Sequence, residues 1–439
     1  MKKFLIFTSD AFILYASLVA TVWVRYPKDF ERQYWIHLYP FGLIFVLWLL
    51  VFYIANLYEP KLLRNNLRFY STLFQAITIS GIISVLFFYL IPLYGITPKT
   101  NLLLFAGIFF GLEFLSRFTS NNIIQKGFKK SVLIVGTNNQ SLELNLYLKE
   151  NPQIGYEIKS IIDLSSDKIQ EINKIIAEEK IDTIILSPEA YKIPKIINIF
   201  YKSLEQKVSF MNLASFYEHV TGMVPLEAIG QIWFLENLNE GNKRAYEMMK
   251  RVSDLIFAFL IGIVSLLFYP LIFILIKTTS PGPIFYRQKR IGQAGKIFKI
   301  IKFRTMSQDA EKTTGAVWAI SDDPRITKIG KFMRRARLDE LPQIWNILKG
   351  EMSFIGPRPE RPSFVEKLRE KIPFYDLRVC VRPGITGWAQ IRYPYGASEE
   401  DALEKLKYDL YYIKNWSFFF DILILFETIK VVLFGKGGR

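Results

Sequence analysis

The chain has 439 residues, of which 51% are hydrophobic and 15% aromatic, and its formal net charge is +16, a composition typical of a membrane protein. The basic residues flank apolar segments, so a membrane surface and anionic substrates explain this charge better than nucleic acid does. The single cysteine, Cys380, excludes an internal disulfide framework, and the two distant histidines, His37 and His219, argue against a histidine-based metal site.

Four apolar segments predict a transmembrane four-helix bundle over residues 1–125. The segments cover residues 4–24, 35–58, 69–93 and 101–118. Basic residues at 2–3, 61–68 and 126–130 place both ends of the bundle in the cytoplasm by the positive-inside rule. A cleavable signal peptide is the alternative for the first segment, but no small-residue cleavage site follows it.

Residues 130–240 change character and predict a Rossmann-like, nucleotide-binding-like domain. Buried strands are expected at 131–136, 158–163 and 183–187, with a polar helical stretch at 168–180. The glycine fingerprint for a dinucleotide is degraded, because no second or third glycine follows Gly136 at the required spacing. We therefore favour a structural, regulatory or oligomerisation module, and a homodimer through this domain is compatible with the sequence.

Residues 255–276 carry no charge and are long enough to cross a bilayer. Pro270 lies inside this segment and basic residues flank both of its ends, so we predict a re-entrant membrane helix over 252–276. The alternative is a fifth true span, which would place everything after Lys277 outside the cell.

The apolar tail at 418–434 contains Asp421, Glu427 and Lys430. Because these charges recur along the segment, it is interpreted as an interfacial helix lying on the membrane. A core helix with a few exposed charges is the alternative.

The segment 326–360 is the most informative, because it sets two adjacent carboxylates, Asp339 and Glu340, between Arg334 and Arg337 on one side and Arg358 on the other. This combination suits phosphoryl chemistry. One acid can attack phosphorus, the other can hold a divalent metal, and the arginines can neutralise phosphate oxygens. The alternative is structural, since an Asp before a proline-containing first helical turn is often only a cap.

A series of motifs in the same half of the chain resembles the bacterial sugar transferase family, the monotopic polyprenyl-phosphate phosphoglycosyl transferases. In order, the motifs are KFRTM at 302–306, DPRIT at 323–327, LDELPQ at 338–343, GPRP at 356–359, RPGITGWAQ at 382–390 and DLYY at 409–412. The resemblance covers residues 246–439 without large gaps. The bundle and the middle domain also resemble the N-terminal parts of the long members of this family.

The resemblance implies a mainly α catalytic domain at 246–439, on the cytoplasmic face of the bacterial inner membrane. It implies transfer of hexose-1-phosphate from a UDP-sugar, with glucose or galactose favoured, to undecaprenyl phosphate, with release of UMP. This would be the first membrane step of exopolysaccharide, capsule or O-antigen synthesis.

Site residues are carried over from the family position by position. Asp339 is expected to be the nucleophile that forms an aspartyl-phosphosugar intermediate, and Glu340 is expected to act with it and to bind Mg²⁺. A nearby helix N-terminus is expected to keep Asp339 ionised. The expected phosphate-binding residues are Lys302, Arg304, Arg334, Arg358 and Arg382.

Two residues depart from the family pattern. Tyr269 stands before Pro270 where members often have serine, and Arg337 stands where a small hydroxyl residue is common. Tyr269 leaves open how the freed backbone groups near Pro270 are bonded. Arg337 adds a positive charge that could alter the affinity for the sugar donor.

Three alternatives to the covalent enzyme stay open on the sequence. In one, the carboxylates act only through metal in a direct transfer. A second is a transporter or flippase for lipid-linked sugars, against which we count the scarcity of charges in the four spans, where Glu113 is the only one identified. The third is a non-catalytic membrane scaffold, against which the intact Asp-Glu and Arg-Pro motifs speak.

Overall fold

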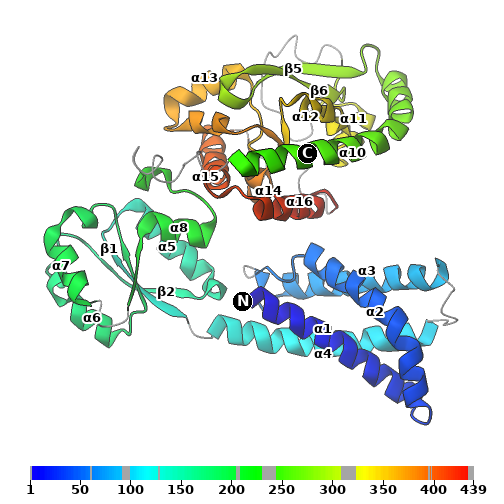
Figure 1. Cartoon of the computed structure of the whole chain (residues 1–439). Coiled ribbons are helices and arrows are strands. Elements are labelled where there is room, and N and C mark those ends of the chain that lie inside the picture. The colour runs from blue at the N-terminus through cyan, green and yellow to red at the C-terminus, as the bar shows by residue number, and fades with distance from the viewer. Residues whose placement is uncertain are drawn as a thin grey trace. The chain divides into compact units, whose positions relative to one another are not determined.

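The computed structural model describes residues 2–59, 62–90, 99–126, 129–203, 208–229, 244–307, 323–393, 396 and 398–433. The chain divides into two compact units, Met1–Leu213 and Ala214–Arg439, and each is described by itself (Figure 1).

The first unit begins with four long apolar helices. They are α1 (Lys2–Arg25), α2 (Phe30–Ile54), α3 (Leu67–Leu90) and α4 (Lys99–Lys126). Each contains a stretch long and apolar enough to cross a membrane. Packed aromatic rings such as Trp48, Phe105 and Phe109 fill the space between the helices. The predicted membrane bundle is therefore compatible with the fold, and the predicted end of the third segment, 91–93, lies outside the described residues.

A charged cluster lies inside this bundle. The guanidinium of Arg117 in α4 is 2.5 Å from Asp10 Oδ2 of α1 and 2.5 Å from Glu113 Oε1, and all three side chains are almost fully buried. The expectation that Glu113 is the only charge in the spans is therefore wrong. Charged groups can be buried among apolar helices when they are paired with each other. The scarcity of charge no longer argues against a transporter.

A parallel four-stranded sheet follows in the same unit, in the order β2-β1-β3-β4. Its strands are β1 (Lys130–Val135), β2 (Tyr156–Ile162), β3 (Thr183–Leu186) and β4 (Ser209–Asn212). The helices packed around it are α5 (Asn139–Glu150), α6 (Ile172–Glu178) and α7 (Pro194–Ser203) (Figure 1). The three predicted strands are confirmed. The fourth was missed because it is short and its side chains are at most half-buried, so no apolar run marks it.

The second unit begins earlier than the sequence predicts. Helix α8 (Leu213–Thr221) and the following residues to Ile229 pack into the same core as the C-terminal half of the chain. The indole nitrogen of Trp388 donates to the carbonyl of Gly222 at 3.0 Å, which ties this segment to the RPGITGWAQ motif. The predicted boundary at residue 240 lies outside the described residues.

The second unit is mainly helical. Its long helices are α10 (Arg244–Thr279), α15 (Glu399–Asn415) and α16 (Phe418–Leu433), and its shorter ones are α11 (Lys328–Arg335), α12 (Ile344–Lys349), α13 (Pro362–Lys371) and α14 (Trp388–Arg392). The 3-10 helices η10 (Leu338–Gln343) and η11 (Tyr375–Cys380) join them. An antiparallel hairpin of β5 (Phe285–Ile291) and β6 (Ile297–Phe303) and a short parallel pair of β7 (Ser353–Ile355) and β8 (Gly384–Thr386) complete the unit.

Helix α10 is helical through Pro270 and changes direction in its second half (Figure 1). It also qualifies by length and composition as a membrane-crossing helix. Its first turns are anchored by Arg251, whose guanidinium donates to the carbonyls of Ile347 and Leu348 at the end of α12. Near the proline, the ring of Tyr269 packs edge-on against Phe303 of β6, with ring centres 5.0 Å apart. The re-entrant path through a membrane stays a prediction.

Helix α16 buries its charged residues and exposes its apolar ones, whereas an interfacial helix is expected to expose its charges to water. Asp421, Glu427 and Lys430 are all buried. Asp421 pairs with Lys250 of α10 at 2.5 Å, and Glu427 pairs with Lys430 at 2.7 Å. The large apolar side chains, Phe419 foremost, face outward. The charges therefore hold α16 inside its unit, and its exposed face is hydrocarbon.

Candidate active site

The segment that carries the two carboxylates enters the site through a tight reversal of the chain. Thr327 caps α11 by accepting the backbone N–H of Gly330 at 2.9 Å. After α11, Arg337 adopts a left-handed conformation, with φ of 57°, and turns the chain into η10. The N-cap of η10 is Arg337 and not Asp339, so the purely structural interpretation of Asp339 as a cap finds no support.

Glu340 is surrounded by cations. Its Oε1 accepts hydrogen bonds from Lys302 Nζ and from Arg358 Nη2, both at 2.8 Å. Its Oε2 accepts from Arg337 Nη1 at 3.4 Å. Lys302 comes from β6, Arg358 from the loop after β7, and Arg337 from the turn before η10. One buried carboxylate thus collects three positive side chains from separate parts of the chain.

Asp339 is equally buried but has no such clamp. Among the residues that the structure describes, none makes a hydrogen bond or ion pair to its carboxyl group. Its exposed fraction is only 7%. Because no described residue bonds this carboxyl group, it is available to a substrate that enters the site.

The surroundings drive the two carboxyl groups apart in acidity. Burial raises the pKa of Asp339, and the neighbouring charge of Glu340 adds to this, while Lys302 and Arg334 oppose it. Burial also opposes ionisation of Glu340, but Lys302, Arg358 and Arg337 outweigh it and hold the pKa of Glu340 well below its usual range. Adjacent carboxyls with opposite shifts are a common sign of divided chemical roles.

The lysine of the cluster is itself perturbed. Burial lowers the pKa of Lys302, and nearby Arg358 adds to this, while the charges of Glu340 and Asp339 oppose the shift. A site with this many cations around one carboxylate is prepared for an anionic ligand.

The other predicted phosphate-binding residues divide into two groups. Arg334 lies beside the cluster, with its Nε donating to Thr305 Oγ1 at 2.9 Å. Arg304 is elsewhere engaged, since its guanidinium donates to the carbonyls of Ser280 and Pro281 at 2.6 and 2.7 Å. It anchors the turn after α10, and its predicted phosphate contact has no support in the structure.

Arg382 and the arginine loop are brought together through their backbones. An added Cβ at Gly356 would lie 2.3 Å from the carbonyl oxygen of Arg382, and one at Gly384 would lie 2.1 Å from the backbone nitrogen of Gly356. Only glycine allows the GPRP and RPGITGWAQ motifs to cross this closely. In the described part of the chain, no hydrogen bond or ion pair joins Arg382 to Asp339 or Glu340.

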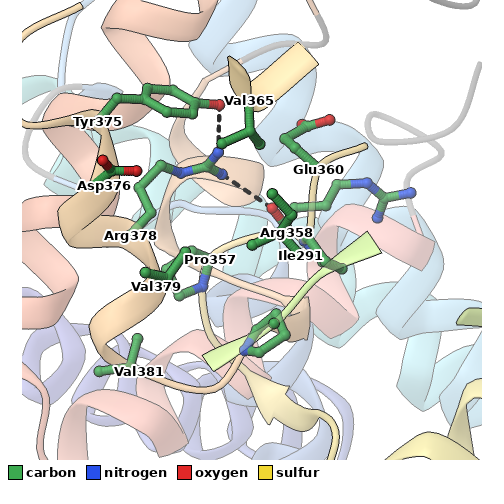
Figure 2. Close-up of a pocket in the computed structure, with 13 residues that line it drawn as sticks. Ile291, Pro357, Arg358, Glu360, Val365, Tyr375, Asp376, Arg378, Val379 and Val381 are labelled. Carbon is green, nitrogen blue, oxygen red and sulfur yellow. Dashed lines mark hydrogen bonds between the residues drawn. The ribbon is translucent and has the colours of Figure 1, made fainter. Parts of the chain in front are cut away.

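Arg378, which the sequence analysis did not identify, supports the backbone of the loop that carries Arg358. The largely buried guanidinium of Arg378 donates to the carbonyl of Arg358 at 3.0 Å, to Asp409 Oδ2 at 2.7 Å and to the hydroxyl of Tyr375 at 2.7 Å. Figure 2 shows Arg378 reaching the backbone of Arg358, whose own side chain extends away from it. The DLYY motif was the available signal, because Asp409 is its first residue.

The donor atoms around the cluster fit a small divalent cation only in part. In the part of the chain that the structure describes, no group of three or more His, Cys, Asp or Glu side chains lies together. Asp339 and Glu340 are two carboxylates, which is the number that Mg²⁺ usually takes from a protein when substrate phosphates supply other ligands. The free carboxyl of Asp339 and the weakly bonded Oε2 of Glu340 are the oxygens that could serve.

Comparison with known proteins relates this chain to a protein family. The family model for the bacterial sugar transferase matches residues 245–435. A UDP-glucose:undecaprenyl-phosphate glucose-1-phosphate transferase of Klebsiella pneumoniae is 32% identical over 318 residues, which cover 69% of this chain and 67% of that protein.

Two further relatives match a shorter part of the chain at higher identity. A UDP-N-acetylgalactosamine-undecaprenyl-phosphate N-acetylgalactosaminephosphotransferase of Aeromonas hydrophila is 47% identical, over 44% of this chain and 46% of its own length. A UDP-glucose:undecaprenyl-phosphate glucose-1-phosphate transferase of Escherichia coli K12 is 45% identical, over 42% of this chain and 39% of its own length. The matched part thus spans less than half of these two relatives.

Proposed function

The chain belongs to the bacterial sugar transferase family, and on this premise we propose that it transfers hexose-1-phosphate from a UDP-sugar to undecaprenyl phosphate. The observation that carries the proposal is the pair Asp339 and Glu340, one carboxyl free and the other clamped by three cations. A free carboxyl beside clustered cations suits nucleophilic attack on a phosphate ester.

The reaction has two steps at one phosphorus atom. The Asp339 carboxylate forms a bond to the phosphorus that carries the sugar, and the bond from this phosphorus to the UMP oxygen breaks, so that UMP leaves with the electron pair. A phosphate oxygen of undecaprenyl phosphate then attacks the same phosphorus, and the bond to Asp339 breaks. The products are UMP and undecaprenyl-diphosphate sugar, and Asp339 regains its carboxylate.

The positive side chains stabilise charge that develops in both steps. Lys302 and Arg358 face the diphosphate, and Arg334 supports ionised Asp339 from the side. Glu340 keeps these cations in place and, with Asp339, would hold Mg²⁺. The ion, when bound, neutralises diphosphate oxygens and the departing UMP.

The identity of the transferred sugar, the cellular location and the pathway are also proposals. UDP-glucose and UDP-galactose are the donors predicted from the sequence, and the name of the Aeromonas relative adds UDP-N-acetylgalactosamine. We place the catalytic unit on the cytoplasmic face of the bacterial inner membrane, where UDP-sugars are made, with α10 re-entrant. The product would begin an exopolysaccharide, capsule or O-antigen, and a homodimer through the sheet-containing domain stays a prediction.

UMP release tests the proposed function. Purified full-length protein in detergent is incubated with Mg²⁺, undecaprenyl phosphate and each UDP-sugar in turn, beside the variant Asp339→Asn. We expect the wild type to release UMP with one preferred sugar, and the variant to be slower by a factor of about 10³ or more. Equal rates would remove Asp339 as the nucleophile. No release with any UDP-sugar would contradict the proposed activity.

A further inference from the structure

A cavity of about 170 Å³ in the second unit runs between the carboxylate cluster and the apolar helices α10 and α16. Arg337 and Glu340 line one part of it, and Ile261 of α10 and Val431 of α16 line another. Its remaining lining comes from η10, α12, the strands β7 and β8, and α14. One cavity thus connects Glu340, the neighbour of Asp339, with the two helices whose exposed faces are hydrocarbon.

The lining of this cavity is mostly apolar, and several of its polar groups are already bonded. The hydroxyls of Thr386 and Thr428 bond each other at 2.8 Å. The side-chain nitrogen of Gln390 donates to the carbonyl of Ile385 at 3.0 Å, whereas its Oε1 has no hydrogen-bond partner among the described residues. A sugar or a nucleobase needs hydrogen-bonding partners when it is buried, whereas a hydrocarbon chain needs none. The occupant that matches this wall is therefore a hydrocarbon.

The positive charge in the cavity wall indicates which chemical group the hydrocarbon chain should carry. Of the residues that line the cavity, Arg337 alone is cationic, and it lies next to the carboxylates. A chain that carries a phosphate at its head would place this anion beside Arg337 and its first carbons between Ile261 and Val431. Ile261 lies on a helix long and apolar enough to cross a membrane, so the rest of a long chain can continue into lipid.

We infer that this cavity holds the first isoprene units of the polyprenyl phosphate acceptor, with Arg337 facing the acceptor phosphate. The inference rests on the proposed function and assigns its second substrate to a place. It also gives a role to the arginine that stands where the family commonly has a small hydroxyl residue. Arg337 serves the acceptor step, in which the acceptor oxygen bonds to phosphorus as the bond to Asp339 breaks.

Matched tryptophan variants of the full-length protein test the cavity. Ile261→Trp fills it from α10, whereas Ile263→Trp changes a more exposed residue of the same helix that does not line it. Val431→Trp and Ile429→Trp form a second such pair on α16. Having two pairs keeps the test decisive if one cavity variant fails to fold.

Each variant is measured in two assays. Exchange of labelled UMP into the UDP-sugar without acceptor reports the first step alone, and transfer to undecaprenyl phosphate reports both. For the two cavity variants we expect the acceptor KM to rise about tenfold or more. UMP exchange should stay within about twofold, and the two control variants should resemble the wild type in both assays.

Three results would overturn the assignment. An unchanged acceptor KM in both cavity variants would place the tail elsewhere, and an equal rise in the controls would indicate a general effect on membrane insertion. If added phosphatidylethanolamine raises the Tm of the wild type but not that of the cavity variants, and the acceptor KM is unchanged, the cavity would be assigned to a membrane phospholipid. Absence of UMP exchange and of transfer in the wild type would instead contradict the proposed function itself.

Discussion

Two adjacent carboxyl groups, Asp339 and Glu340, have opposite electrostatic surroundings although both are buried. The difference comes from direct contacts, since three cations bond Glu340 and none of the described residues bonds Asp339. A helix N-terminus, which the sequence led us to credit with keeping Asp339 ionised, is not the dominant influence. Burial is the largest influence and raises the pKa of Asp339.

This shift predicts the pH dependence of the first step. Asp339 must lose its proton to attack, so the rate of UMP exchange should fall as the pH falls through a pKa above the 3.8 of an ordinary aspartic acid. Arg334 lowers this pKa, so Arg334→Gln should move the acidic limb to higher pH. Arg334→Lys keeps the charge and serves as the control. If the activity of Arg334→Gln falls at the same pH as that of the wild type, or at a lower pH, Arg334 does not lower the pKa of Asp339.

Arg378 is a positioning residue, because it contacts the backbone of Arg358 and not the carboxylates. Arg378→Gln should lower kcat by about 10- to 100-fold with a smaller change in the donor KM, since misplacing a charged group by about 1 Å has effects of this size. In an Arg358→Lys background, the same change should cost much less, because the two residues act in series. Fully additive losses, accompanied by an equal loss of thermal stability in both backgrounds, would reduce Arg378 to a purely structural role.

The sequence could predict which residues form the site but not all of their contacts. Asp339, Glu340, Arg358 and Lys302 were identified from motifs, and the structure brings them together. Arg304 belongs to the same motif as Lys302 but follows the last residue of β6, where the alternation of the strand no longer fixes its direction, and its guanidinium donates to the carbonyls of Ser280 and Pro281 instead. The DLYY motif marked Asp409 but not its partner Arg378, since their pairing depends on a fold that returns η11 behind the GPRP loop.

At the scale of elements, helices α10 and α16 are joined by a buried network. Lys250 of α10 pairs with Asp421 of α16, and the hydroxyl of Tyr412 donates to the same carboxylate at 2.9 Å. This pairing keeps both charges inside the unit and turns the apolar faces of both helices outward. The sequence pattern alone could not tell buried charges from exposed ones, because hydropathy does not report on pairing.

Removing one partner of this pair should destabilise the unit. Asp421→Asn leaves Lys250 buried without its ion-pair partner, and a loss of about 3–5 kcal/mol is expected. The double variant Lys250→Met with Asp421→Leu should lose less, since it removes both charges. Thermal unfolding of the detergent-purified proteins measures this. A single variant with the Tm of the wild type would mean that the network contributes little to holding α10 against α16.

At the scale of the whole molecule, the residues proposed to carry the transferase chemistry lie in one compact unit. Asp339, Glu340 and the three cations that bond Glu340 all lie in Ala214–Arg439. The bundle and the sheet-containing domain form the other unit. Apolar periodicity predicted the bundle and three of the four strands. It could not locate the division of the units, because residues 214–229 resemble a continuation of the α/β pattern and are assigned to the second unit only by their contacts with distant residues.

Two truncations test this division. A chain of residues 214–439 should fold and retain UMP exchange, because it keeps Val224, Leu226 and Ile229 in the core. A chain of residues 241–439 removes these side chains and should be less stable and prone to aggregate. The first truncation also separates the enzyme from a transporter, whose activity would require the bundle. If 214–439 is folded but has no exchange activity, catalysis depends on the first unit.

The central claim, that Asp339 becomes covalently bonded to the sugar phosphate, is tested most directly by mass spectrometry. Full-length protein is incubated with Mg²⁺ and its preferred UDP-sugar without acceptor, quenched in acid and digested. We predict that the peptide containing Asp339 gains the mass of one sugar phosphate, and that this adduct disappears when undecaprenyl phosphate is added. Full product formation with no adduct on this peptide, and no release of UMP before the acceptor is added, would contradict the claim and favour a direct transfer.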